Sequence, residues 1–430
     1  MNAVVTQAPV AHAKVEPAAA PRGARPNVLL VQILLWPNAA RLALAFQATD
    51  CGVHVLCRRG SPVRKLSSIN GIAIYHPFFP LRSLQAAIEA ATPDLIIPCD
   101  DLAVALLLRL LSRLDPATPT GRRIKAVIER SLGRPSSYRR ASARSELASI
   151  AAQARVLLPR TRSVSTLDEL LDWLGRKGFP AVLKINHSWG GRGVSIIKNL
   201  CEAERAHHRM TGSRALLRAV GRVIRYRDPE PLLQVSHAWR PMLSVQAYIA
   251  GRPANCAVAC WEGEVIASIA VEALVTRTPT DHATVIRVIE NPQMADTARR
   301  IVRQLGVTGF FGFDFVLEES SGQAFLVEIN PRATQINHLA LGAGRDLPAA
   351  LRARMSRSPL REAAAVTDCE TIALFPQEWR RDPHSGFLQT AYHDVPYDAP
   401  ELARAQMGIR GFTLARGSVK GNLPSRQRAS

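Results

Sequence analysis

The first part of the chain alternates between short apolar runs and stretches with helical spacing of apolar residues. The apolar runs are typical of buried strands, and the stretches between them predict amphipathic helices. The predicted elements are strands at residues 27–35, 52–57 and 94–98 and helices at residues 39–50 and 81–91. Strands that alternate with helices predict a parallel sheet with helices on its faces. Asp100 and Asp101 follow the third strand, at the edge where such sheets bind ligands.

Two later runs, at residues 309–317 and 324–332, alternate with a period of two and predict a β-hairpin. On the first strand, Asp314 lies on the opposite face from its large apolar neighbours. On the second strand, Glu328 and Asn330 share a face. The residues predicted on the other face of that strand are Phe325, Val327 and Ile329.

The turn of this hairpin decides how its acidic residues pair. A three-residue loop at 320–322, with Gly322 in the left-handed conformation, places Asp314 opposite or nearly opposite Glu328. Directly paired residues have Cβ atoms about 5 Å apart. Two carboxylates at this short distance repel each other unless a cation or a proton lies between them. Oxygen ligands of this kind suit Mg²⁺. The alternative interpretation is a surface hairpin whose acidic face is solvated.

The middle of the chain contains a lysine on a strand, followed by a glycine-rich loop. Lys184 lies in the apolar run 179–185, and a further strand is predicted at 194–198. The loop between them contains three glycines, whose backbone N–H groups could approach a phosphate closely: Gly190, Gly191 and Gly193. Lys184 is placed to bring its charge to the same phosphate. The alternative is a plain glycine-rich turn beside an exposed lysine.

A third run, at residues 243–251, predicts a strand that ends at Gly251. Its backbone could offer a carbonyl and an N–H group to the flat edge of a purine. The alternative is an ordinary sheet strand. No GxGxxG sequence follows any predicted strand and no GxxxxGK[ST] sequence occurs, which excludes the common dinucleotide and P-loop motifs.

Composition narrows the class of protein. The chain has 430 residues, of which 47% are hydrophobic and 21% charged, as expected for two or three globular domains. No apolar run reaches the roughly 18 residues that span a bilayer. The formal charge of +20 is spread along the chain, mostly on arginines, which favours anionic small-molecule ligands over nucleic acid. Seven scattered cysteines without a CxxC pair predict reduced thiols and a cytoplasmic location.

These motifs, in this order, resemble those of the ATP-grasp superfamily. The resemblance covers roughly residues 132–341, and its most specific part is the closing pair of segments at 312–315 and 327–332. The stretch from residue 285 to 306 also resembles the branch related to carbamoyl phosphate synthase large subunits and carboxylate–amine ligases. The resemblance implies an α/β protein with an N-terminal parallel-sheet domain, followed by an ATP-grasp fold of two α+β subdomains.

The resemblance also implies a role for individual residues. Lys184 and the earlier basic residue Arg144 would contact ATP phosphates, and Arg332 would act catalytically on the transferred phosphate or the substrate carboxylate. The adenine would be bound by the hinge residues Gln246, Ala247 and Ile249, and the metal by Asp314, Glu328 and Asn330. Many members of the superfamily carry Glu at the position of Gln246, and the acidic residue that binds ribose has no match here. His338 and Arg287 are candidates for the substrate site.

The resulting prediction is an ATP-dependent ligase that uses Mg²⁺, or alternatively Mn²⁺. It would activate a carboxylate as an acyl phosphate for attack by an amine or a thiol. An ATP-binding protein of the same fold without turnover and a basic nucleic-acid-binding protein are the alternatives, and a homodimer is left open. The predicted organisation is a disordered arm (1–26), an N-terminal α/β domain (27–125), the ATP-grasp domain (126–350), a C-terminal completing segment (351–415) and a basic flexible tail (416–430).

Overall fold

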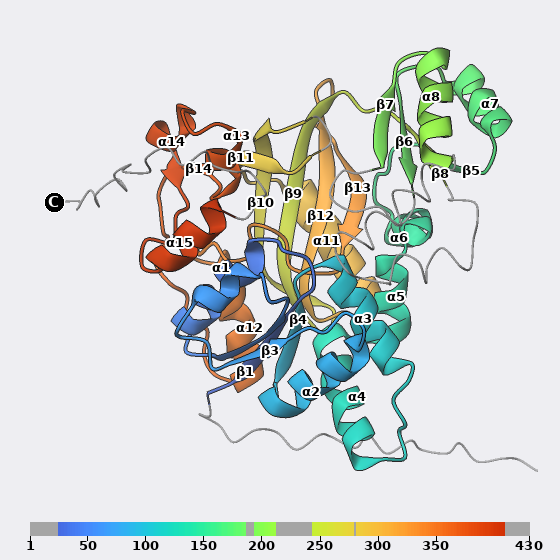
Figure 1. Cartoon of the computed structure of the whole chain (residues 1–430). Coiled ribbons are helices and arrows are strands. Elements are labelled where there is room, and N and C mark those ends of the chain that lie inside the picture. Colours follow the sequence, from blue (N-terminus) through green and yellow to red (C-terminus); the bar gives the residue numbers. More distant parts are fainter. Residues whose placement is uncertain (1–24, 186–192, 212–242, 279–280, 409–430) are drawn as a thin grey trace, which may run out of the picture.

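The computed structural model describes residues 25–185, 193–211, 243–278 and 281–408 (Figure 1). Nearly all of the predicted N-terminal arm and the whole predicted C-terminal tail lie outside these residues. Within them, the chain folds as an N-terminal parallel sheet followed by two further sheets. The predicted fold class is confirmed.

The N-terminal sheet has the order β3-β2-β1-β4, and all of its strands are parallel. Its strands are β1 (Asn27–Gln32), β2 (Gly52–Cys57), β3 (Gly71–Ile74) and β4 (Leu95–Pro98). The helices around it are α1 (Asn38–Ala48), α2 (Pro80–Ala91), α3 (Asp101–Leu111) and α4 (Pro119–Leu132). The sequence analysis missed β3. This strand has only four residues, lies at the sheet edge and is only partly buried.

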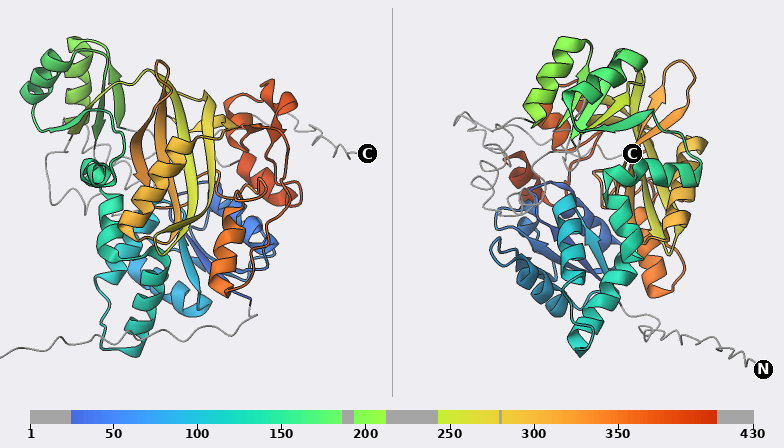
Figure 2. Two further views of the ribbon diagram at one scale, coloured as in Figure 1. Left: turned by 180° about the vertical axis from the view of Figure 1, so that it is seen from behind. Right: turned by 90° about the vertical axis from the view of Figure 1, so that its right-hand side faces the viewer.

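The largest sheet has the order β13-β12-β9-β10-β11-β14-β15. Its first five strands along the chain are β9 (Gly251–Trp261), β10 (Glu264–Thr276), β11 (Ala283–Val288), β12 (Gly309–Glu318) and β13 (Ala324–Asn330). Helix α11 (Pro292–Leu305) packs on one face and α12 (Leu347–Ser356) packs on the other. Figure 2 shows α11 lying across the long strands in the view from behind.

The C-terminal segment completes this sheet and covers part of the N-terminal domain. It contributes β14 (Thr371–Ala373), α13 (Gln377–Arg381), α14 (Phe387–Thr390), β15 (Tyr392–His393) and α15 (Pro400–Met407). Strand β14 pairs with β11, and Gln406 of α15 donates to the carbonyl of Pro37 beside α1. The segment therefore ties the two ends of the described chain together.

The third sheet is small and has the order β5-β8-β6-β7. Its strands are β5 (Thr161–Val164), β6 (Ala181–Ile185), β7 (Val194–Ile197) and β8 (Leu243–Ala247). Helices α7 (Leu167–Lys177) and α8 (Leu200–Thr211) cover one face with a separate apolar core. In Figures 1 and 2 these helices lie on the outside, so the sheet's other face is turned toward the large sheet.

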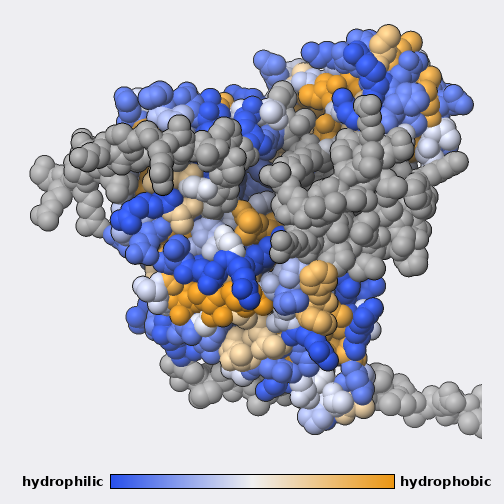
Figure 3. All heavy atoms as spheres, viewed as in Figure 1, coloured by the Kyte–Doolittle hydropathy of each residue, from blue (hydrophilic) through white to orange (hydrophobic). Residues whose placement is uncertain are grey.

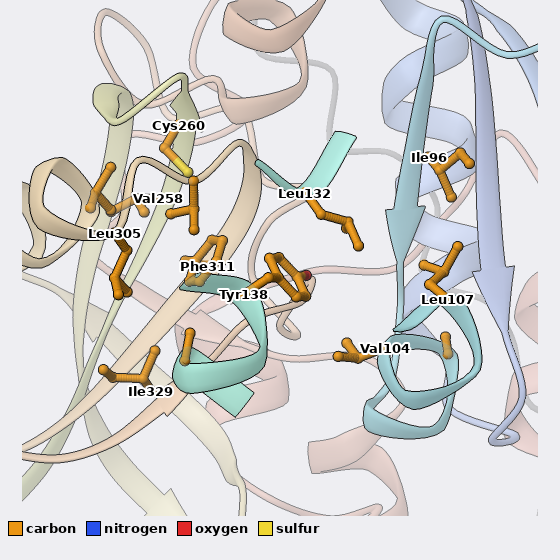
Figure 4. Packing of buried hydrophobic residues seen from close by; sticks show 14 of the residues in the cluster. Ile96, Val104, Leu107, Leu132, Tyr138, Val258, Cys260, Leu305, Phe311 and Ile329 are labelled. Atoms are coloured by element: carbon orange, nitrogen blue, oxygen red, sulfur yellow. The ribbon is translucent and has the colours of Figure 1, made fainter. Parts of the chain in front are cut away.

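One core joins the N-terminal domain to the large sheet. Figure 4 shows Tyr138, from α5 (Pro135–Ser142), between Phe311 of the large sheet and the residues around α3. The Tyr138 and Phe311 rings meet edge to face with centroids 5.5 Å apart. The Tyr138 hydroxyl donates to the carbonyl of Pro331, directly after β13. This contact positions the turn that carries Arg332.

The face of the molecule in Figure 3 is largely hydrophilic, with hydrophobic patches over the N-terminal domain. None of the helices in the described ranges has the length and apolarity needed to cross a membrane.

Candidate functional site

The predicted acidic pair is present in the large sheet. Asp314 of β12 pairs directly with Glu328 of β13, as predicted. The predicted three-residue loop is wrong, because the Glu318 N–H group donates to the Gln323 carbonyl and encloses a loop of residues 319–322. Gly322 has the expected left-handed conformation, with φ of 69°.

A β-bulge restores the predicted pairing. The register shifts between Asp314, which pairs with Glu328, and Phe315, which pairs with Leu326. The extra residue on β13 compensates for the extra loop residue. Because a one-residue shift turns side chains to the other face, the pairing of Phe325 with Val316 puts Phe325 on the acidic face. The prediction that Phe325 lies on the opposite face was therefore wrong.

Asp314 is oriented by two asparagines. Asn255 of β9 donates through Nδ2 to Asp314 Oδ1 at 2.6 Å, and Asn330 donates through Nδ2 to Oδ2 at 2.8 Å. Burial and the neighbouring charge of Glu328 raise the pKa of Asp314 despite these hydrogen bonds. Sequence reasoning missed Asn255. The alternation along β9 marks its face, but only the pairing of β9 with β12 brings it to Asp314.

Arg332 extends this network to the N-terminal domain. Its Nη2 donates to Asn330 Oδ1 at 3.0 Å, and its Nε lies 3.0 Å from Asp101 Oδ2. The guanidinium lies over the Trp36 ring, 4.9 Å from its centroid. Burial alone would lower the pKa of Arg332, but the charge of Asp101 raises it. Arg332 is thus a buried, charged residue held between two domains.

The carboxyl edge of the N-terminal sheet is fixed by a buried aspartate. Asp100 accepts hydrogen bonds from the N–H groups of Ile33 and Leu34 at 2.7 and 2.8 Å, and it caps α3 through the N–H group of Ala103. Burial raises the pKa of Asp100 to about 6. These contacts hold the segment that leads to Trp36, whose ring meets His282 edge-on at 6.1 Å. Sequence reasoning did not identify Trp36 or His282.

The small sheet brings two other predicted residues to one face. Lys184 pairs with Ser244, and Gln246 pairs with Val182, so both side chains lie on the face away from α7 and α8. Gln246 also donates through Nε2 to Thr161 Oγ1 at 3.2 Å. This face is the one turned toward the large sheet (Figure 1).

The predicted hinge connects the two sheets. The single strand predicted at 243–251 is wrong: β8 ends at Ala247, and β9 begins at Gly251 in the large sheet. Ile249 lies in the link between them. A Cβ atom at Gly251 would lie 2.0 Å from the Leu317 carbonyl oxygen, so glycine is required where the link joins the sheet.

The remaining predicted residues are placed as follows. Gly193 has a φ of 100°, whereas Gly190 and Gly191 lie outside the described residues. Arg144 begins the short helix η2 (Arg144–Glu146), and its side chain is outside the described part of the chain.

His338 and Arg287 each contact a carboxylate other than Asp314. His338 Nε2 lies 2.7 Å from Asp394 Oδ2, and Asp394 also pairs with Arg41 of α1. Burial lowers the pKa of His338. Arg287 forms an ion pair with Glu272 on the other face of the large sheet.

The oxygen atoms around Asp314 fit a divalent cation. Two carboxylates lie side by side, and burial together with the charge of Glu328 raises the pKa of Asp314. Asn255 Oδ1 is buried and has no hydrogen-bond partner among the described residues. A hard cation that takes oxygen ligands would offset the negative charge of the two carboxylates and give Asn255 Oδ1 a partner.

Comparison with known proteins agrees with this geometry. A family model described as an ATP-grasp domain matches residues 228–335. A search of curated protein sequences found no match. Among solved structures, an ADP complex of N5-carboxyaminoimidazole ribonucleotide synthetase is 13% identical, with 79% of each chain covered and a TM-score of 0.57.

Two further structures have similar scores. The synthetase of the same name from Thermotoga maritima is 15% identical, with 79% of this chain and 78% of that chain covered and a TM-score of 0.53. An L-amino acid ligase from Bacillus licheniformis is 12% identical, with the same coverage and a TM-score of 0.51. At these identities the likeness establishes the fold alone. The family match identifies an ATP-grasp domain within residues 228–335, which confirms the resemblance found in the sequence.

Proposed function

We propose that this protein is an ATP-dependent ligase that activates a carboxylate as an acyl phosphate for attack by an amine. The observation that carries the proposal is the direct pairing of Asp314 with Glu328, connected through Asn330 to the buried Arg332. These four residues place negatively charged oxygen ligands next to a fixed positive charge. Phosphoryl transfer requires this combination, because catalysis depends mainly on positioning and on neutralising charge.

ATP would lie between the small sheet and the large sheet. The Ala247 carbonyl and the Ile249 N–H group would bind the adenine edge, with Gln246 beside them. Lys184 would contact the α- and β-phosphates, since it lies on the face of the small sheet that is turned toward the large sheet. Arg144 would supply a further positive charge, and the loop that contains Gly190, Gly191 and Gly193 would cover the phosphates.

Asp314, Glu328 and Asn330 would hold Mg²⁺, or Mn²⁺ in its place. When bound, the cation supplies positive charge to the β- and γ-phosphate oxygens. Asn255 keeps Asp314 in position through the hydrogen bond at 2.6 Å. The protein thus fixes the orientation of the carboxylate oxygens of Asp314.

The reaction would proceed in two displacements. A carboxylate oxygen of the substrate attacks the γ-phosphorus, the bond to the β,γ-bridging oxygen breaks, and ADP leaves. The amine then attacks the acyl carbon, the bond to the phosphate oxygen breaks, and inorganic phosphate leaves as the amine loses a proton. Arg332 would stabilise charge on the transferred phosphoryl group, because its guanidinium is held in place by Asp101 and Trp36.

The carboxyl edge of the N-terminal sheet would contribute to the acceptor site. Asp101 and Trp36 both contact Arg332 from this edge, so the N-terminal sheet would lie beside the proposed reacting centre. Ligands of open α/β sheets bind at this edge. His338 and Arg287 take no part in the proposed reaction.

The test is release of phosphate from ATP with panels of carboxylates and amines. Turnover should require Mg²⁺, a carboxylate and an amine together, and Glu328→Gln should abolish it. Glu319→Gln is the matched control, because Glu319 is an exposed acidic residue on the same hairpin. ATP binding without phosphate release for any substrate pair would favour a nucleotide-binding protein. Full turnover in Glu328→Gln would contradict the metal assignment.

A further inference from the structure

A separate cavity of about 650 Å³ opens on the large sheet near the end of β11. Its charged lining residues are Arg252, Glu272, Arg287, Glu290, Arg345 and Glu370. None of these residues contributes to the nucleotide site proposed above. The cavity therefore requires its own explanation.

The strand register places this cavity on the sheet face opposite Asp314. Asn255 pairs with both Asp314 and Val271, so these three residues share one face. Glu272, the next residue on β10, pairs with Ala254 of β9 and with Arg287 of β11. Because successive side chains on a strand alternate faces, Glu272 and Arg287 lie on the other side.

The inner wall of the cavity has an excess of positive charge. The Glu272 side chain is only 2% exposed, and its carboxylate lies 2.9 Å from Arg252 Nε and 2.5 Å from Arg287 Nε. One carboxylate thus holds two guanidinium groups. Both arginine side chains remain accessible, with 64% of Arg252 and 40% of Arg287 exposed. Their remaining N–H groups can bind a carboxylate of a ligand.

The mouth of the cavity has acidic groups. Glu290 Oε1 lies 3.8 Å from Arg345 Nη2, and its side chain is 89% exposed. Glu370 is exposed as well. These carboxylates would repel a polyanion such as a nucleotide, and they would attract an ammonium group.

We propose that this cavity binds a zwitterion of the amino acid type, either a free amino acid or a short peptide. The ligand carboxylate would contact Arg252 and Arg287, and its ammonium group would lie near Glu290 and Glu370. The volume is within the range of roughly 300–1,000 Å³ found for small-molecule sites. This site does not depend on the proposed ligase reaction, because it lies on the other face of the sheet.

The site is nevertheless linked covalently to the nucleotide hinge. Arg252 directly follows Gly251, where the link from β8 enters the large sheet, and it precedes Asn255 on the same strand. A ligand on Arg252 would thus contact the strand that also carries a partner of Asp314. Simultaneous binding with ATP is expected, since the two ligands occupy opposite faces.

The test uses the full-length protein and saturation-transfer NMR. The probes are the common L-amino acids and L-alanyl-L-alanine, which separate a free amino acid from a peptide. Probes that bind are then measured by calorimetry, together with two charge controls. The N-acetylated form lacks the ammonium group, and the C-terminal amide lacks the carboxylate.

Binding should weaken about tenfold or more in Arg252→Gln, because a charge-assisted hydrogen bond is lost. Arg354→Gln is the matched control. Arg354 is 44% exposed and pairs with Glu264 at 2.7 Å, but it does not line the cavity. Its replacement should leave the affinity unchanged, and both charge controls should bind more weakly than the zwitterion. Thermal melts confirm that the variants are folded.

Four results would overturn the proposal. They are no binding of any probe, unchanged affinity in folded Arg252→Gln, equal affinity for the N-acetylated form, and displacement of the probe by ATP. The third result would indicate a simple anion site. The fourth would place the ligand in the nucleotide site.

Discussion

Replacing Glu328 with glutamine should stabilise the protein in the absence of metal and abolish its response to Mg²⁺. Glutamine keeps the size and shape of the side chain but removes one of the two charges that face each other across β12 and β13. Two unit charges about 5 Å apart repel by about 3 kcal/mol at the effective dielectric constant typical near a protein surface. Arg332 offsets part of this repulsion, since its charge lowers the pKa of Asp314 while Glu328 raises it.

The net gain in the free energy of unfolding is therefore smaller than the pair repulsion. We expect about 1–2 kcal/mol, which raises the melting temperature of a chain of this length by about 1–2 °C. The wild-type protein should be stabilised by Mg²⁺, because a ligand that binds only the native state stabilises it by mass action. Glu328→Gln should lose this stabilisation, together with all ATP turnover.

Thermal melts with EDTA and with Mg²⁺ measure both effects, and phosphate release from ATP measures turnover. Glu319→Gln should behave like the wild-type protein in all three assays, because its carboxylate is exposed and lies in the hairpin loop. The reasoning would be refuted if the melting temperature of Glu328→Gln without metal were not above that of the wild type. Equal stabilisation of both proteins by Mg²⁺ would place the metal elsewhere.

Three further predictions concern other parts of the site. Lys184→Ala should weaken ATP binding without unfolding the protein, and unchanged affinity in calorimetry would contradict its phosphate contact. Asn255→Ala should lower turnover about tenfold with the fold intact, because Asp314 loses a charge-assisted hydrogen bond, and steady-state kinetics check this. Burial raises the pKa of Asp100 to about 6, so its stabilising contribution is present below about pH 4 and is lost as the pH rises through 6. The loss amounts to about 3 kcal/mol, and melts from about pH 4 to 7 should show it in the wild type but not in Asp100→Asn.

The hairpin illustrates what strand alternation can and cannot predict. The period of two was sufficient to place Asp314 opposite Glu328, which the structure confirms. The path to that pairing was wrong, because the loop is one residue longer than predicted and a bulge on β13 absorbs the difference. Alternation assumes an unbroken ladder, so it cannot detect two irregularities that cancel. Phe325, which lies between them, is the residue whose face was wrongly predicted.

Contacts between strands that are far apart in the chain set a stronger limit on what the sequence can predict. Asn255 reaches Asp314 across 59 residues of sequence, because β9 lies between β12 and β10 in the sheet. Asp101 and Trp36 reach Arg332 from another domain, and only the packing of the two domains brings them there. The same limit applies to Arg287, which the sequence marks as a charged residue on an apolar strand without indicating its face. Its pairing with Glu272 fixes that face and places the cavity on the side of the sheet opposite Asp314. The order of strands in the large sheet therefore determines both which residues surround Asp314 and which residues are left to form the zwitterion site behind it.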